Sequence, residues 1–138
     1  MIAYVDSSVI LRLVLGQANA LAEWRHINRG ISTALTRVEV LRTLDRLRLR
    51  AALSDAEMSL RRSAVLQGLD LLELVEADAV VLERAAQPMP TELRTLDAIH
   101  LATALLWRER SSAELVMATH DRRMGVAAQA HGFKVVGT

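Results

Sequence analysis

Four acidic residues stand at the ends of predicted secondary-structure elements, where they could do chemistry together. Asp6 closes the apolar run 2–5, and Asp121 follows a second apolar run, 115–119. Glu39 and Asp97 each lie near the start of a predicted helix. In a parallel α/β sheet, the carboxyl ends of the strands and the adjacent helix starts form one rim, where ligands bind. Acids that are far apart in the sequence could therefore meet in one pocket.

A pocket with four carboxylates calls for a cation. At roughly 5 Å and an effective dielectric constant near 20, two carboxylates repel each other by about 3 kcal/mol. Four together are tenable only with a cation between them or with raised pKa values. Because hard cations prefer carboxylate oxygens and water as ligands, the sequence predicts a Mg²⁺ or Mn²⁺ site.

Each acid also has an ordinary structural role open to it. Asp6 could form an Asx turn into the next helix. Glu39 could pair with an arginine one turn further along its own helix. Asp97 could complement a helix dipole, and Asp121 could be an N-cap. The joint placement of the four on one rim is what favours a functional site.

Polar residues next to the acids are further candidates for the site. Ser7 and Thr119 carry hydroxyl groups next to acids and could hold water or orient a carboxylate. His100 lies one helical turn beyond Asp97 and could flank the site, but we interpret it as a hydrogen-bonded structural histidine. His120 receives the same interpretation.

The composition predicts a globular chain in a reducing compartment. Its 138 residues are 51% hydrophobic and 24% charged, so residues 1–138 are expected to form a single domain. The absence of cysteine excludes disulfides and thiolate metal sites and fits the cytosol. The longest apolar stretch is broken by Asp97 and His100 and is too short for a bilayer. No signal peptide is evident, so a cytoplasmic location is expected.

Overall charge does not argue for nucleic-acid binding, because the net charge is only +1. Aromatic residues make up 3% of the chain, which excludes a surface of stacked aromatic side chains. The basic residues are almost all arginine, with Lys134 the one lysine, and a guanidinium fork suits phosphate oxygens. A coding bias toward arginine is the plainer explanation.

Short apolar runs alternate with amphipathic helical patterns along the chain. The predicted strands are 2–6, 31–35, 72–75, 115–119 and 135–136. The predicted helices are 8–15, 36–51, 54–69, 78–87, 96–110 and 122–131, with a further helical turn in 17–28. This alternation predicts an α/β fold, a parallel sheet with helices on both faces.

Capping residues set several of these boundaries. Ser7 and Ser8 offer N-caps for the first helix, and Thr95 offers one for the helix over 96–110. Residues 54–57 form a capping box. Gly132 suits a left-handed position after the last helix.

Several short segments occur together along this chain. They are Asp6-Ser7-Ser8, 36–40 around Glu39, 93–104 around Asp97, and Thr119-His120-Asp121 followed by Gly132 and the terminal Val-Val strand. These segments resemble the PIN-domain family, and in particular the VapC-type toxins of bacterial and archaeal toxin–antitoxin pairs. The similarity covers essentially the whole chain in order, and its most specific part is 93–104.

The resemblance implies a five-stranded parallel sheet in the order 3-2-1-4-5, and a Mg²⁺-dependent endoribonuclease held silent by a VapB-type antitoxin. It implies that Asp6 and Asp97 are the primary metal ligands, while Glu39 and Asp121 hold the metal's waters or a second ion. An extra acid of some family members has no clear counterpart here, which leaves one or two metals open.

The implied chemistry is hydrolysis of RNA phosphodiester bonds by a metal-activated water. A divalent cation lowers the pKa of its water and offsets charge on the phosphate oxygens during in-line attack. No protein nucleophile is needed, in agreement with the absence of cysteine. Candidate phosphate contacts near the rim are Arg42, Arg46, Arg122 and Arg123. Solvated surface charge is the plainer interpretation of these arginines.

There are three rivals to the nuclease function. An aspartate-nucleophile phosphatase needs a second acid two residues after Asp6, where the chain has Ser8. A phospho-acceptor receiver domain needs an acidic pair after the first strand, where Asp6 is followed by Ser7. The remaining alternative is a PIN-like module that binds RNA or protein without cutting, and such a module has no reason to maintain repulsion among four acids.

The high hydrophobic content is a reason to expect interfaces with other protein chains. Large apolar surfaces usually mark interfaces, so a homodimer and a groove for an antitoxin's C-terminal segment are expected. A generous core is the plainer explanation of the same content. Nothing in the sequence chooses the target RNA.

Overall fold

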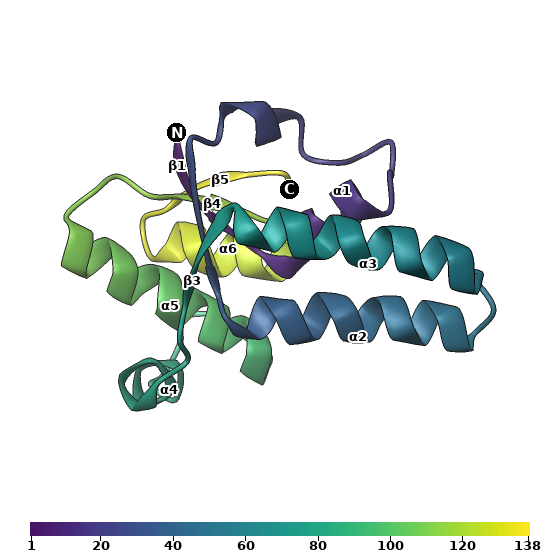
Figure 1. The fold of residues 1–138 in the computed structure, drawn as a ribbon. Helices are drawn as coiled ribbons and strands as arrows, with labels where there is room; N and C mark the ends of the chain where they lie inside the picture. The colour runs from purple at the N-terminus through teal and green to yellow at the C-terminus, as the bar shows by residue number, and fades with distance from the viewer.

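The computed structural model describes all of residues 1–138 and is built around one five-stranded parallel sheet (Figure 1). The strand order is β3-β2-β1-β4-β5, so the predicted fold class and strand order are confirmed. The strands are β1 (Ile2–Val5), β2 (Arg29–Thr33), β3 (Leu72–Val75), β4 (Val116–Ala118) and β5 (Lys134–Val136). The central neighbours are β1 and β4, with Val5 paired opposite Ala118, so the two chain segments that follow them leave the sheet side by side.

Six α-helices and one 3₁₀ helix surround the sheet. They are α1 (Ser7–Val14), η1 (Ala22–His26), α2 (Leu35–Leu49), α3 (Asp55–Asp70), α4 (Ala79–Ala85), α5 (Thr95–Ser111) and α6 (Arg122–Ala130). In Figure 1, α2 and α3 lie side by side and extend beyond the sheet. None of the helices is both long enough and apolar enough to cross a membrane.

Two apolar clusters, one on each face of the sheet, form most of the core. Successive residues of a strand point to opposite faces. Ala3 and Val5 accordingly pack with side chains of α1, α2 and α3, whereas Tyr4 packs with Leu101 of α5 and Met124 of α6. Each fully buried large apolar side chain contributes about 1.5–3 kcal/mol, so the helices hold β1 firmly from both faces.

The second strand differs from its predicted position. It runs from Arg29 to Thr33, two residues earlier than the predicted 31–35, and it includes Gly30. A Cβ atom built on Gly30 would lie 2.4 Å from Cδ2 of Leu72, so the close approach of β2 and β3 requires glycine. The glycine was predicted to precede the strand, but it lies inside it.

Two predicted helix caps are wrong. The first helix begins at Ser7 itself, with Asp6 in the N-cap position and no side-chain cap. The helix α5 likewise begins at Thr95, with Arg94 as its uncapped N-cap residue. The capping box of Ser54 and Glu57 is present as predicted, and Gly132 has a left-handed φ of +78°.

Candidate active site

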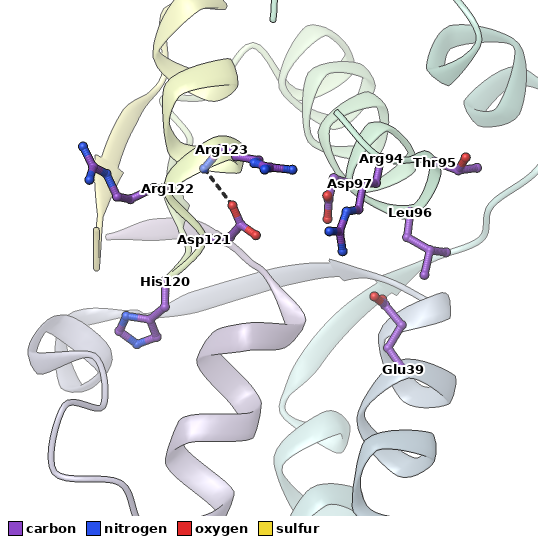
Figure 2. A pocket seen from close by; sticks show the side chains of 9 residues that line it. All are labelled: Glu39, Arg94, Thr95, Leu96, Asp97, His120, Asp121, Arg122 and Arg123. Carbon is purple, nitrogen blue, oxygen red and sulfur yellow. Dashed lines mark hydrogen bonds between the residues drawn. The ribbon is translucent and has the colours of Figure 1, made fainter. Parts of the chain in front are cut away.

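The four predicted acids come from four elements that meet at the carboxyl edge of the sheet. Asp6 directly follows β1, Glu39 lies on α2, Asp97 lies in the first turn of α5, and Asp121 precedes α6. The last three line one pocket of ≈ 560 Å³ (Figure 2). Asp6 does not line the pocket and is 5% exposed. The fold thus brings three of the acids into one pocket and places Asp6 at the same edge of the sheet.

The Asp6 carboxylate is held by hydroxyl groups on one of its two oxygens. Oδ2 accepts hydrogen bonds from Ser8 Oγ at 2.6 Å and from Thr119 Oγ1 at 2.8 Å. Oδ1 has only longer contacts, at 3.5 Å with Ser7 Oγ and at 3.8 Å with Nδ1 of His100. Oδ2 is therefore occupied by the protein, and Oδ1 is the oxygen left for a ligand. Ser8 was predicted only as a helix cap, although a hydroxyl two residues after a strand-end aspartate was an available signal for this contact.

Glu39 points into the site and forms no ion pair along its own helix. Its Oε1 atom lies 2.6 Å from Nε2 of His100, which is 1% exposed. The i,i+3 partner considered for Glu39, Arg42, is paired with Asp45 at 2.9 Å. His100 is hydrogen-bonded as predicted, since its Nδ1 atom also lies 2.9 Å from the Tyr4 hydroxyl, but it lies among the acids of the site.

Asp121 caps a helix and lines the pocket at the same time. Its Oδ1 atom accepts hydrogen bonds from the backbone N–H groups of Arg123 at 2.7 Å and Met124 at 3.1 Å, the first of which is drawn in Figure 2. The other carboxylate oxygen makes no hydrogen bond within the chain. The N-cap role and a role in ligand binding are therefore compatible.

The electrostatics of the pocket are those of carboxylates that repel one another. Burial raises the pKa of Asp97, and the charges of Asp121, Asp6 and Glu39 raise it further, against a lowering effect of His100. For His100 itself, burial lowers the pKa, but the hydrogen bond that its ring donates to Glu39 and the charges of the surrounding acids outweigh burial, so the net shift of the pKa is upward. The site thus holds four acids and one histidine, and the net effect on Asp97 is a raised pKa.

Three arginines surround the acids. Arg94, Arg122 and Arg123 line the pocket, and none of their guanidinium groups forms an ion pair within the chain. In Figure 2 the side chains of Arg94 and Arg123 lean toward the acids, whereas Arg122 points away. Arg94 was not among the predicted residues. Its only signal in the sequence was its place three residues before Asp97.

The other two predicted arginines lie in an adjoining groove of ≈ 370 Å³. This groove shares Glu39 and Leu96 with the acidic pocket, so the two hollows are continuous. Arg42 forms an ion pair with Asp45, and Arg46 donates a hydrogen bond to Thr43 Oγ1 at 2.8 Å.

Comparison with known proteins agrees with this geometry. A family model described as PIN domain matches residues 3–130. This chain belongs to the PIN-domain family. Ribonuclease VapC46 of Mycobacterium tuberculosis (strain ATCC 25618 / H37Rv) is 37% identical over 137 residues, which cover 96% of this chain and 95% of the relative. Ribonuclease VapC35 of the same strain is 36% identical over 139 residues, with 96% and 94% covered. This PIN domain is therefore of the VapC type.

The donor set of this PIN domain fits a hydrated cation. No three of its histidine, aspartate and glutamate side chains converge into a ready-made metal cage. Mg²⁺ is commonly bound through one or two carboxylates and keeps several waters, whereas Zn²⁺ in structural sites takes four protein ligands. The acids of this site come from four separate elements, and Asp6 and Asp121 each keep one carboxylate oxygen without a short hydrogen bond. This arrangement suits a hydrated Mg²⁺ ion.

Proposed function

We propose that this chain is a Mg²⁺-dependent endoribonuclease that acts as the toxin of a toxin–antitoxin pair. The observation that supports the proposal best is the acidic pocket, in which burial and mutual repulsion raise the pKa of Asp97 and no arginine or lysine forms an ion pair with the acids. Such a concentration of carboxylates is favourable when a cation binds. The VapC relatives named as ribonucleases support the same conclusion.

In this proposal the acids divide into two pairs. Asp6, through Oδ1, and Asp97 would bind Mg²⁺ or Mn²⁺ directly, and Glu39 and Asp121 would hold its waters or a second ion. When bound, the cation supplies an activated water and offsets the charge that develops on the phosphate. Ser7, Ser8 and Thr119 keep Asp6 oriented, and no side chain of the protein has to act as nucleophile.

Arginines along the two hollows would hold the RNA backbone. Arg94 and Arg123 lean over the acids, where a scissile phosphate would lie next to the cation. Arg42 and Arg46 line the adjoining groove, where a neighbouring phosphate could be held, and Arg122 stands at the far edge of the pocket. Phosphate contacts of this kind position the strand without reading its sequence.

Partners and location form part of the proposal. A VapB-type antitoxin would cover the pocket inside the cytoplasm, and the chain would form a homodimer. Exposed apolar side chains such as Val38 and Leu96, 58% and 46% exposed beside the site, support an interface there. Light scattering at tens of micromolar tests the dimer, and a monomer under those conditions would contradict it.

The central test is cleavage of RNA by the purified chain. Cleavage is expected with Mg²⁺ or Mn²⁺, to be lost with chelator, to return when metal is restored, and to leave 5′-phosphate and 3′-hydroxyl ends. Binding of RNA without cleavage under any of these metals would favour the alternative, a PIN-like binding module. A cleavage rate indifferent to chelator would contradict the metal-dependent mechanism.

A further inference from the structure

One buried imidazole joins acids that come from different elements of the site. Nε2 of His100 lies 2.6 Å from Oε1 of Glu39 on α2, and Nδ1 lies 3.8 Å from Oδ1 of Asp6 at the end of β1. The Tyr4 hydroxyl lies 2.9 Å from the same Nδ1 atom. Tyr4 is fully buried and meets the imidazole edge to face, with the ring centroids 5.8 Å apart.

Hydrogen-bond chemistry gives this chain of contacts a direction. A carboxylate can only accept, so Nε2 of His100 donates to Glu39. A tyrosine hydroxyl is protonated near neutral pH, so the Tyr4 hydroxyl, 2.9 Å away, can donate to Nδ1. Rotating the imidazole would leave buried polar groups unpaired, at a cost of about 1–3 kcal/mol for each group. The ring is therefore fixed by its two partners.

The His100 contact is the one short side-chain hydrogen bond that Glu39 makes. Its other polar side-chain contact is Ser7 Oγ, 3.5 Å from Oε2, and the arginine one turn along α2 is paired elsewhere. Glutamate has three side-chain torsions, so without an anchor its carboxylate would sample several positions around the pocket. The bond to His100 occupies Oε1 and leaves Oε2 as the oxygen available to the cation or its waters.

We propose that His100 is a positioning residue, which holds Glu39 so that Oε2 is presented to the metal pocket, and that Tyr4 in turn fixes the imidazole. The inference rests on the proposed metal-dependent function. Partners of this kind behind a metal ligand typically change metal affinity or activity by about 10–100-fold when removed. A histidine that served the core alone would change stability and nothing at the metal.

Two substitutions of His100 separate these roles. His100→Gln places an amide N–H near the position of Nε2 and can still donate to Glu39. His100→Asn is shorter, so that its amide reaches the position of Nδ1 but cannot reach Glu39. Leu105→Ala, in the core on the same helix, serves as a control that destabilises the protein without contact with the acids.

The experiment measures Mn²⁺ binding by the loss of the free-ion electron paramagnetic resonance signal, with thermal unfolding and RNA cleavage recorded in parallel. His100→Asn is expected to weaken Mn²⁺ binding about tenfold or more, His100→Gln to stay within about threefold of wild type, and Tyr4→Phe to fall between them. Leu105→Ala should lower Tm and leave the Mn²⁺ affinity of the folded protein unchanged.

The outcomes are distinguishable. Wild-type Mn²⁺ affinity in folded His100→Asn, or equal losses in His100→Asn and His100→Gln, would overturn the positioning role. In a Glu39→Ala background, His100→Asn should cause no further loss, and a full additional loss would overturn a role exerted through Glu39. If His100→Asn does not fold, Tyr4→Phe decides in the same way. Absence of Mn²⁺ binding by the wild-type chain would instead overturn the proposed function, and this inference with it.

Discussion

The hydroxyl of Thr119 donates a 2.8 Å hydrogen bond to Oδ2 of Asp6 and so joins the ends of β4 and β1 at the centre of the sheet. The preceding residues, Ala118 and Val5, are paired in register, so the side-chain bond continues the strand pairing. The same hydroxyl accepts the backbone N–H of Asp121 at 3.0 Å. One buried side chain thereby places two of the four acids.

Replacing Thr119 should damage both stability and the site. Thr119→Val keeps the shape but removes the hydroxyl, leaving buried partners unpaired, and should lower the free energy of unfolding by about 1–3 kcal/mol. Loss of the Asp6 orientation should slow RNA cleavage by about 10–100-fold. Thr119→Ser should restore most of both. Urea unfolding and cleavage assays check this, and a valine variant with the wild-type cleavage rate would contradict it.

Asp6→Asn should abolish RNA cleavage and leave the fold intact. The amide can still accept from Ser8 and Thr119, but it removes the charge that would bind the cation. Cleavage is measured with saturating Mg²⁺ and folding by circular dichroism. Asp70→Asn, an exposed site at the end of α3, is the matched control and should cut like wild type. Equal cleavage rates in the two variants would remove Asp6 from the mechanism.

The architecture was predictable because it depends on periodicity and on element ends. Strands with apolar residues on both faces and helices with one apolar face leave few arrangements, and Asp6 and Asp121 mark where two strands stop. The misplaced β2 shows the limit of this reasoning. In the sequence alone, Gly30 indicates a strand boundary. Only the side chain of Leu72, distant in sequence but close in space, explains why glycine lies inside the strand.

The detailed site was less predictable because side chains compete for partners. Glu39 had an arginine within reach on its own helix and a histidine 61 positions away, and the structure favours the histidine. The bond from Ser8 to Asp6 and the approach of Arg94 to the acids depend on side-chain directions that sequence spacing does not define.

Asp97→Asn should stabilise the metal-free protein in a pH-dependent way. The pKa of Asp97 is raised above its ordinary 3.8, first by burial and then by the charges of Asp121, Asp6 and Glu39. The folded state therefore holds this proton more tightly than the unfolded state. The stability contributed by the group is fully present below its unfolded pKa and is lost as pH rises through the raised folded pKa.

For this half-buried group, solvent screening limits the expected gain of Asp97→Asn to about 0.5–1 kcal/mol at neutral pH in EDTA. The gain should shrink as pH falls through the raised pKa. Saturating Mg²⁺ should make the wild type more stable than the Asn variant, because only the wild type binds the ion well. Urea unfolding across pH, with and without Mg²⁺, checks this. An Asn variant less stable than wild type in EDTA at pH 7 would contradict the repulsion.

Arg94→Ala and Arg123→Ala should weaken RNA binding through lost phosphate contacts. Each substitution should reduce the slope of log affinity against log salt concentration by about 0.7, the value for one contact with a single strand. Binding is measured in the Asp6→Asn background, so that RNA is not cut. Arg62→Ala removes the same charge from the exposed surface of α3 and should leave the slope unchanged. Identical slopes for all three variants would show that neither pocket arginine contacts phosphate.

Antitoxin binding should compete with Mg²⁺. A guanidinium pairs with carboxylates through two parallel hydrogen bonds, so an antitoxin arginine could enter the pocket among Glu39, Asp97 and Asp121 and take the place of the cation. Two ligands that use the same acids exclude each other, and each lowers the apparent affinity of the other by the same factor. The antitoxin's affinity should therefore fall as the Mg²⁺ concentration rises, and Asp97→Asn should weaken antitoxin binding and make it less dependent on Mg²⁺.

Calorimetric titrations of the antitoxin over a series of Mg²⁺ concentrations measure both effects. If the affinity ignores both the metal and the substitution, the antitoxin inhibits by covering the path of the RNA, because a partner that never touches the acids has no reason to respond to either change.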